Sequence, residues 1–484
     1  MKKLLALLLA LIMVLSLVAC GAKEEAGAET PEAETPAADT AATEEAGASD
    51  TEVAQAEKTN EEAITVTYFF TAGNYLDVFT AEVDKWNAGE GADKGVYLEV
   101  TCNINDGSAA AELQMQAGNH FDIMDGCTNA EWILQGWVQD LWAIENEELQ
   151  AHIAAKEQYF VPGLEVKYDQ LNCLPLEVVP LKFAVNTDLF EASALELPET
   201  FDDVVAAAQK ITEDNPGTAW GYGGTTWSAF YRRLHMKHMA SSIETPWWDP
   251  NTGTYSFGQY EPVMSAIKTM YENEWILGMD DLAIDPIRAE FAAGKVGMFP
   301  APGYDWAVYT NQFPATCNFA FIDMPTITEE EEYMGMYLDR VTPGIDKVQF
   351  EAADDAKKQA IVDAYLFITG DYLKSVIYAN GGLIPYEMDI IEATELVITE
   401  NAEQWAQVSD LTNLGSMLQY PDGIIPLEGD TYQTCMNAYV HGEYEWDEMV
   451  ADLEERYNAA WAEAVADPDI NTDMYLYDYN HDLP

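Results

Sequence analysis

The hydrophobic and polar positions divide the chain into three consecutive stretches. Residues 4–17 are an almost unbroken apolar run that follows Lys2 and Lys3. Residues 21–63 consist mainly of Ala, Glu, Thr, Gly and Pro and contain no aromatic side chain. From Ile64 onward, apolar residues recur with the spacings of strands and helices. The first stretch is typical of a secretory signal peptide. The second predicts a disordered acidic tether, because it cannot bury enough apolar surface to offset the entropy of ordering.

The third stretch begins with alternating strand and helix patterns. Ile64–Phe70 is rich in β-branched and aromatic residues and predicts a buried strand. The patterns that follow predict a helix, a strand, a helix and a strand, in that order, at residues 75–86, 96–101, 109–117 and 121–124. Strands that alternate with helices through short links predict a parallel sheet with both faces covered. Ligands of such sheets bind beyond the carboxyl ends of the strands, and Tyr75 and Asp125 each follow a predicted strand.

The rest of the chain predicts further helices and one long extended segment. Residues 174–190 are extended and interrupted by prolines. Thr200 and Asp203 have the spacing of a capping box, which predicts the start of a helix. A helical pair is predicted over residues 352–380, and a last amphipathic helix has its apolar stripe within residues 449–461.

The net charge excludes one class of function. The chain has 22 Lys and Arg residues against 85 Asp and Glu residues, for a formal net charge of −63. Phosphate binding needs clustered basic residues, so we expect no nucleic-acid partner, and the overall field disfavours anionic ligands. Removing the first 20 of 484 residues leaves 464, which is enough for two lobes with cores of their own.

The cysteines do not predict a disulfide framework. Five of them lie beyond Cys20, at positions 102, 127, 173, 317 and 435. This odd and widely spread set favours mostly buried thiols. A pair between Cys102 and Cys127 stays open.

The chain contains few signatures of enzyme chemistry. It has neither the H-E-x-x-H metal motif nor the G-x-S-x-G nucleophile motif. Ser265 and Lys268 have the S-x-x-K spacing but lie on a predicted amphipathic helix without the accompanying motifs. His235 and His238 share a helix face without a carboxylate motif to complete a metal site. We therefore expect no catalytic residue, no metal and no cofactor. Paired carboxylates leave a secreted glycoside-acting hydrolase open.

The end of the first apolar run resembles a bacterial lipoprotein box. Leu17-Val-Ala-Cys20 closes the run, and Gly21 follows. The resemblance implies that residues 1–20 are a lipoprotein signal peptide and that Cys20 becomes the lipidated N-terminus. Two kinds of acyl attachment at Cys20 would supply the two-signal anchoring that a single chain cannot. The protein is then held at the extracellular face of the bacterial cytoplasmic membrane.

Further motifs occur in an order that resembles the extracellular solute-binding proteins, family 1, of bacterial ABC importers for sugars. The most specific is Phe291-Ala-Ala-Gly-Lys-Val-Gly-Met298. The others include Phe121-Asp-Ile-Met124, Val185–Phe190, Leu197–Asp203, Ala364–Gly370 and Gly381–Pro385. This chain has Val-Asn-Thr at residues 185–187 where the family commonly has Tyr-Asn-Lys. It has Phe201 after Thr200 where the family commonly has Trp.

The resemblance implies an α/β fold of the two-lobed periplasmic-binding-protein type, with a hinge and a ligand cleft between the lobes. The implied N-terminal lobe comprises residues 64–179 plus 320–350, and the implied C-terminal lobe comprises residues 180–319 plus 351–475. The chain would cross between the lobes near residues 176–181, 318–325 and 344–350.

The resemblance also implies a ligand site in which aromatic faces stack on sugar rings and charged groups bond the hydroxyls. Asp125, Glu177, Asp339 and Arg340 would supply the charged contacts. The full set of expected ligand-binding residues is Tyr75, Asp125, Glu177, Tyr222, Trp227, Tyr231, Trp247, Trp248, Tyr304, Trp306, Asp339 and Arg340.

The implied function is that of a lipid-anchored, monomeric and non-catalytic receptor. It would capture a mono- or oligosaccharide between its lobes and deliver it to the permease subunits of an ABC transporter. Two alternatives to the glycoside-acting hydrolase and to this receptor stay open: a surface sensor or adhesion lipoprotein with no permease partner, and a receptor whose solute is a peptide or polyamine.

Overall fold

The computed structural model describes most of the chain beyond residue 52. The described residues are 53, 55–103, 107–160, 163–225, 247–279, 283–327, 335–336, 341–411, 414–415, 420–468 and 470–477. Several sequence predictions concern residues outside these ranges, namely the signal peptide with Cys20, most of the tether, Trp227, Tyr231, Asp339 and Arg340. No helix in the described part of the chain has the length and apolarity needed to cross a bilayer.

The first sheet has the strand order β14-β3-β1-β2. Its strands are β1 (Ile64–Phe70), β2 (Val96–Cys102), β3 (Ile123–Met124) and β14 (Gly344–Ile345). Strand β1 pairs in parallel with β2 and β3, and β14 is antiparallel to β3. The predicted strand Ile64–Phe70 and the predicted parallel sheet are therefore confirmed.

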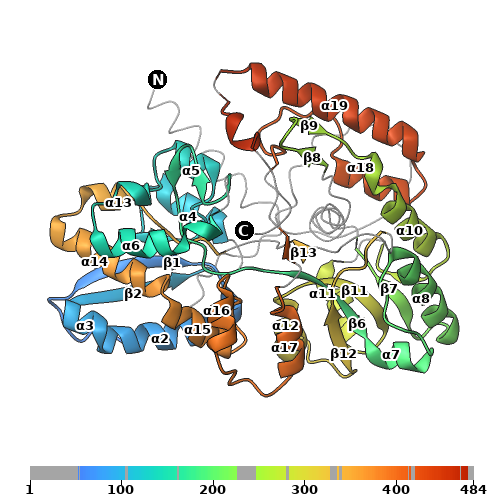
Figure 1. The fold of residues 1–484 in the computed structure, drawn as a ribbon, viewed down its shortest axis with the longest axis horizontal. Coiled ribbons are helices and arrows are strands. Elements are labelled where there is room, and N and C mark those ends of the chain that lie inside the picture. The colour runs from blue at the N-terminus through green and yellow to red at the C-terminus, as the bar shows by residue number, and fades with distance from the viewer. Residues whose placement is uncertain are drawn as a thin grey trace, which may run out of the picture. The chain divides into compact units, whose positions relative to one another are not determined.

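Both faces of the first sheet are covered, because the buried side chains of β1 alternate. Val66, Tyr68 and Phe70 belong to one apolar cluster, while Phe69 belongs to another. The first cluster contains apolar residues of α2 (Leu76–Ala88), α6 (Glu147–Lys156), α14 (Asp355–Ile368) and α15 (Asp371–Ala379). The second contains residues of α4 (Gly107–Gln116) and α5 (Ala130–Leu134). Helices α3 (Glu90–Lys94) and α13 (Lys347–Ala352) complete this lobe (Figure 1).

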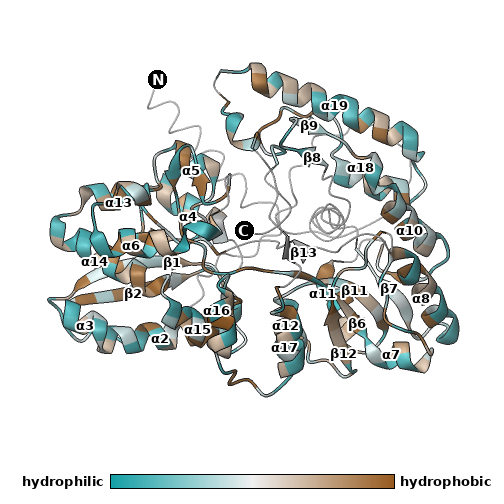
Figure 2. Ribbon diagram, in the orientation of Figure 1, coloured by the Kyte–Doolittle hydropathy of each residue, from teal (hydrophilic) through white to brown (hydrophobic). Residues whose placement is uncertain are grey.

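The second sheet has the strand order β10-β7-β11-β6-β12. Its strands are β6 (Leu181–Asn186), β7 (Trp220–Gly223), β10 (Ile276–Leu277), β11 (Val296–Pro302) and β12 (Phe319–Ile322). Strand β7 is parallel to β10 and β11, whereas β6 is antiparallel to β11 and β12. The strands are the brown, apolar centre of this lobe in Figure 2.

Helices pack on both faces of the second sheet. One apolar cluster joins it to α8 (Phe201–Asp214) and α10 (Glu261–Glu272). The other joins it to α11 (Ile284–Ala292), α12 (Asp305–Ala307) and α17 (Ala402–Val408). Helix α7 (Thr187–Ala192) follows β6 directly. The predicted capping box is confirmed at α8, where Thr200 and Asp203 bond each other's backbone N–H groups.

The C-terminal helices extend the first of these clusters. They are α18 (Tyr432–Val440) and α19 (Trp446–Ala466), and they pack with the hairpin β8 (Trp248–Asp249) and β9 (Thr254–Tyr255). Helix α19 confirms the predicted last amphipathic helix. The remaining short elements are β4 (Val166–Lys167), β5 (Gln170–Leu171), β13 (Gly335–Met336), β15 (Leu414–Gly415) and α16 (Met388–Ala393). The cysteines at 102, 127, 173 and 435 are buried thiols, and that at 317 is a partly exposed one.

Three described segments connect the two sheets, and they hydrogen-bond to one another. The first runs from residue 172 to β6, the second lies between β12 and β14, and the third runs from α15 to α17. The Leu176 N–H donates to the Val341 carbonyl at 3.1 Å, and the Val178 N–H donates to the Ile384 carbonyl at 2.8 Å. The first segment is thus bonded to both others.

The structure differs from the predicted lobe boundaries in three places. Helices α14 and α15 share an apolar cluster with β1, so they belong to the N-terminal lobe although residues 351–475 were assigned to the other one. The third connection follows α15, because residues 344–345 pair with β3 instead of crossing. Strand β12 pairs with β6, so the N-terminal lobe does not resume at residue 320. An apolar stripe shows that a helix must pack, but the stripe does not select the sheet.

Candidate functional site

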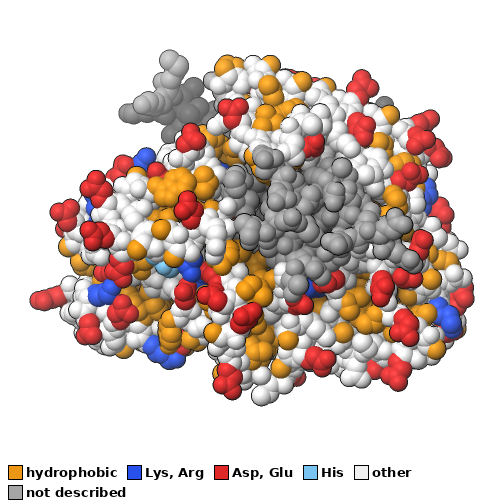
Figure 3. Space-filling model, in the orientation of Figure 1, with side chains coloured by type: hydrophobic (Ala, Val, Ile, Leu, Met, Phe, Trp, Pro, Cys, Tyr) orange, Lys and Arg blue, Asp and Glu red, His pale blue; other side chains and the backbone are white. Residues whose placement is uncertain are grey.

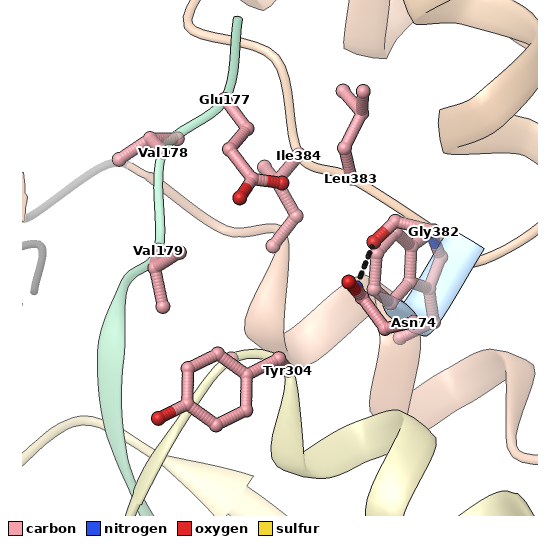
Figure 4. A pocket seen from close by; sticks show the side chains of 10 residues that line it. Asn74, Glu177, Val178, Val179, Tyr304, Gly382, Leu383 and Ile384 are labelled. Carbon is pink, nitrogen blue, oxygen red and sulfur yellow. Dashed lines mark hydrogen bonds between the residues drawn. The ribbon is translucent and has the colours of Figure 1, made fainter. Parts of the chain in front are cut away.

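A small cavity lies where the two sheets are connected. Its volume is about 40 Å³, which is room for about three water molecules and less than a sugar ring needs. Five segments that are distant in sequence meet around it (Figure 4). Its lining residues are Asn74, Glu177, Val178, Val179, Gly303, Tyr304, Gly382, Leu383, Ile384 and Trp405. The cavity therefore marks a junction between the lobes.

The first sheet contributes the loop that follows the carboxyl end of β1. Asn74 Nδ2 donates to the Gly382 carbonyl at 2.8 Å, which ties this loop to the third connection (Figure 4). The adjacent Tyr75 ring is buried against Phe70. Burial raises the pKa of Tyr75, and the nearby charge of Glu177 raises it further. Tyr75 and Glu177 are therefore neighbours across the first connection.

Asp125 holds the same loop from behind β1. Its carboxylate accepts hydrogen bonds from Tyr68 Oη at 2.5 Å, from Thr71 N at 2.8 Å and from Thr71 Oγ1 at 3.0 Å. Burial raises the pKa of Asp125 to about 6, although these hydrogen bonds lower it. Asp125 thus positions the loop that carries Asn74 and Tyr75.

The raised pKa of Asp125 predicts that acidification stabilises the fold. A folded-state value of about 6 against 3.8 for the free group means that the folded state binds the proton more tightly. The stabilisation is fully present below pH 3.8 and is lost as pH rises through 6. Between pH 7 and pH 5 we expect Asp125 to contribute about 1 kcal/mol to the free energy of unfolding. Urea denaturation of the wild type and of Asp125→Asn at both pH values measures this, and equal pH dependence in the two proteins would contradict it.

The second sheet contributes a turn that a buried ion pair holds. Asp305, at the start of α12, accepts hydrogen bonds from Arg288 of α11, at 2.6 Å from Nη2 and 3.3 Å from Nε. Asp305 is fully buried and Arg288 is 9% exposed. Burial raises the pKa of Asp305 to about 6, and Arg288 opposes that rise. The guanidinium also lies 5.9 Å from the centre of the Tyr304 ring. The pair therefore fixes the turn that carries Tyr304.

The structure brings together some of the residues that the sequence singled out. Glu177 and Tyr304 line the cavity, Tyr75 lies beside Glu177, and Asp125 supports the loop that holds Tyr75. Figure 4 shows the Glu177 carboxylate extending from the first connection toward the side of Ile384. A role for these residues in ligand binding stays a prediction.

Four other predicted residues lie in apolar cores. Tyr222, Trp247 and Trp248 are fully buried in the cluster of the second sheet and the C-terminal helices, and Trp306 is 3% exposed. Trp248 packs against Trp461 and donates to the Tyr475 carbonyl at 3.2 Å. Trp306 packs against Trp405 and donates to the Asn401 carbonyl at 2.8 Å. An indole buries a large apolar area, so an isolated Trp in a sequence is compatible with core and site alike.

The sequence interpretation missed Trp405 and the Arg288–Asp305 pair. Trp405 lies in a helix with no recognised motif, and only the tertiary fold brings it to the cavity. The pair did have a signal. Arg288 stands between the apolar residues Ile287 and Phe291 in a chain with few basic residues, and such a position needs a buried partner. Within the described residues, no group of three or more His, Cys, Asp or Glu side chains is arranged to hold a metal.

Solved structures with the same fold are numerous. The GacH receptor of Streptomyces glaucescens, solved unliganded and with acarbose, matches with a TM-score of 0.64 at 12% identity, covering 83% of this chain and 99% of that one. The substrate-binding protein Lmo0181 of Listeria monocytogenes, in complex with cycloalternan, matches at 0.60 and 15% identity, covering 83% and 99%. The sugar-binding protein MalE of Xanthomonas citri matches at 0.61 and 13% identity, covering 83% and 98%. At these identities the likeness shows the fold, which is the two-lobed α/β fold that the sequence predicted.

The sequence itself matches a protein family. No curated protein matches it significantly. The family described as bacterial extracellular solute-binding protein matches residues 72–329, which are more than half of the chain. That range includes the first connection, Tyr75, Glu177 and Tyr304. The chain belongs to the bacterial extracellular solute-binding protein family.

Proposed function

We propose that this protein binds a neutral carbohydrate between its two lobes and passes it on unchanged. The observation that carries the proposal is the junction at which Tyr75, Glu177 and Tyr304 gather from both lobes around the first connection. Hinge closure about such connections buries a ligand against both lobes. The solved relatives support a carbohydrate, since acarbose and cycloalternan are bound in two of them.

The charge of the protein favours a neutral solute. Asp and Glu side chains are scattered over the face of the molecule that Figure 3 shows, and the formal net charge is −63. This field repels anions. A neutral sugar offers hydroxyl donors to the Glu177 carboxylate and an apolar ring face to Tyr304. A micromolar affinity requires about 8 kcal/mol, which a few such contacts supply.

We further propose that the receptor is lipid-anchored and serves an ABC permease. The Leu17–Cys20 motif supports lipidation at Cys20, with the acidic segment from residue 21 acting as the tether. Family membership supports delivery to permease subunits and a receptor without catalytic activity. The mass of the mature N-terminal peptide tests the anchor: an unmodified Cys20 in the membrane-derived protein would refute it.

A thermal-shift screen against neutral mono- and oligosaccharides tests the carbohydrate proposal. A sugar at 100 times its dissociation constant stabilises the folded state by about 2.7 kcal/mol, or about 5 °C for a chain of this size. Calorimetry with Glu177→Gln is expected to show about tenfold weaker binding, because a charge-assisted hydrogen bond is lost. Glu272→Gln, on the exposed face of α10, is the matched control and should bind normally.

Two outcomes would contradict the carbohydrate proposal. If peptides or polyamines stabilise the protein and no sugar does, the solute class is wrong. If a glycoside is cleaved on incubation, and substitution of one carboxylate abolishes the cleavage, the protein is a hydrolase. A stable complex with intact sugar agrees with the receptor.

A further inference from the structure

The first sheet has an edge at β2, since β2 pairs only with β1 among the strands of that sheet. The outer backbone groups of an edge strand need partners. Two side-chain amides supply them at the middle of β2. Asn87 of α2 accepts from Leu98 N at 2.7 Å and donates to Leu98 O at 2.9 Å. Gln55 donates to the same Leu98 carbonyl at 2.6 Å and accepts from Val100 N at 3.1 Å.

Gln55 belongs to a segment that the sequence assigned to the disordered tether up to Ala63. The structure instead holds Val53 and residues 55–58, which we call the edge strap, against the first lobe. The Ala56 N–H donates to Asp84 Oδ1 at 3.0 Å, and the Ala56 carbonyl accepts from Tyr97 Oη at 2.7 Å. Val53 packs against the apolar cluster of the first sheet. The predicted tether is therefore shorter than residues 21–63.

The edge strap runs antiparallel to β2. Lys58 Nζ donates to Thr65 Oγ1 at 3.1 Å, near the amino end of β1, where Thr65 pairs with Tyr97. Gln55, three residues earlier in the chain, bonds Leu98 and Val100. Going from residue 58 back toward residue 53, the chain thus advances toward the carboxyl ends of β1 and β2. The Asn74 loop of the junction lies beyond those ends.

We propose that the edge strap sets where the membrane tether leaves the protein: on the N-terminal lobe, past the middle of β2, on the side of the sheet where the solute is bound. This inference rests on the proposed lipid anchor. The hydrogen bonds given for the strap reach only α2, β1 and β2, so the pull of the anchor is borne by the N-terminal lobe alone. The second lobe is then free to move about the hinge without working against the tether. If the chain were released up to residue 63, the tether would start at the opposite, amino end of β1.

Trypsin tests whether the strap is closed. Lys58 is the one tryptic site between Lys23 and Lys85, and its ammonium is held by Thr65. Loss of the two Gln55 hydrogen bonds raises the open population about tenfold, so Gln55→Ala should be cut at Lys58 about ten times faster than the wild type. Gln116→Ala removes an amide that bonds only Glu112 within its own helix and is the matched control. Equal cutting rates in wild type and Gln55→Ala would overturn the proposal.

Pulsed electron-electron resonance tests the direction of the strap. Spin labels are placed at Glu52→Cys with either Ala109→Cys, just beyond the carboxyl end of β2, or Asp93→Cys, just before its amino end, in full-length protein carrying Cys20→Ser. Ala109 and Asp93 are exposed. We expect the Glu52 label to be closer to position 109 than to position 93, and Gln55→Ala to broaden both distributions. A shorter distance to position 93 would overturn the proposal. Neither readout needs lipid or solute, so failure here is distinct from failure of the proposed receptor function.

Discussion

Replacing Gly381 with alanine is expected to lower the free energy of unfolding by about 3 kcal/mol. Gly381 has a φ of +75°, and a Cβ atom there would lie 2.4 Å from the Trp306 ring. The left-handed backbone costs about 1 kcal/mol for a residue with a side chain, and overpacking a filled core adds about 1–3 kcal/mol. Trp306 cannot move away easily, because it packs against Trp405 and its indole N–H is bonded to Asn401.

The control for Gly381 is Gly442, which separates the two costs. Gly442 has a φ of +78°, and a Cβ atom there would meet no atom within 4 Å. Gly442→Ala should therefore lose only the backbone part, about 1 kcal/mol. Urea denaturation measures both proteins. Equal losses would mean that the third connection yields without strain and that its contact with Trp306 is loose.

Removing the Asp305 carboxylate is expected to cost about 3–5 kcal/mol. Asp305→Ala leaves the Arg288 guanidinium buried and without its partner at 2.6 Å. The remaining partner, Asp285, is exposed and cannot replace it. The turn that carries Tyr304 would lose its support, so sugar affinity should fall together with stability.

An exposed ion pair provides the comparison for Asp305. Lys210 and Asp214 lie 2.5 Å apart on α8, but both side chains are more than a third exposed, and such pairs contribute little. Asp214→Ala should therefore leave stability nearly unchanged. The double variant Arg288→Met/Asp305→Leu should recover most of the loss, because the buried charge is gone. If Asp305→Ala were as mild as Asp214→Ala, water would have to reach Arg288.

The junction between the lobes connects these predictions. Gly381 and Gly382 bring the third connection against Trp306 on one side and Tyr75 on the other. Asp125 and Arg288 each hold one wall from behind, through Thr71 and Asp305. The buried carboxylate Glu387, just before α16, accepts from Lys156 and Lys374 and ties the same connection to the N-terminal lobe. We therefore expect substitutions at this junction to change stability and solute affinity together.

The local pattern of the chain determined the elements and the type of fold. The β-branched and aromatic run Ile64–Phe70, the capping box at Thr200 and the stripe of α19 are recognisable because strand alternation, capping and helical spacing involve neighbours in sequence. Alternation of strands and helices led to the parallel sheet, and the ordered motifs led to the family.

Tertiary packing alone decided which elements share a lobe and which side chains meet. Helix α14 is amphipathic in any context, and only its contacts show that it covers the first sheet. Gln55 lies in a polar segment with no apolar pattern, yet its amide matches the outer edge of β2. Trp248 and Trp306 bury their rings, whereas Tyr304 lines the cavity, since burial depends on residues distant in sequence. Periodicity records only which face of an element is apolar; the partner of that face is set by contacts across the fold.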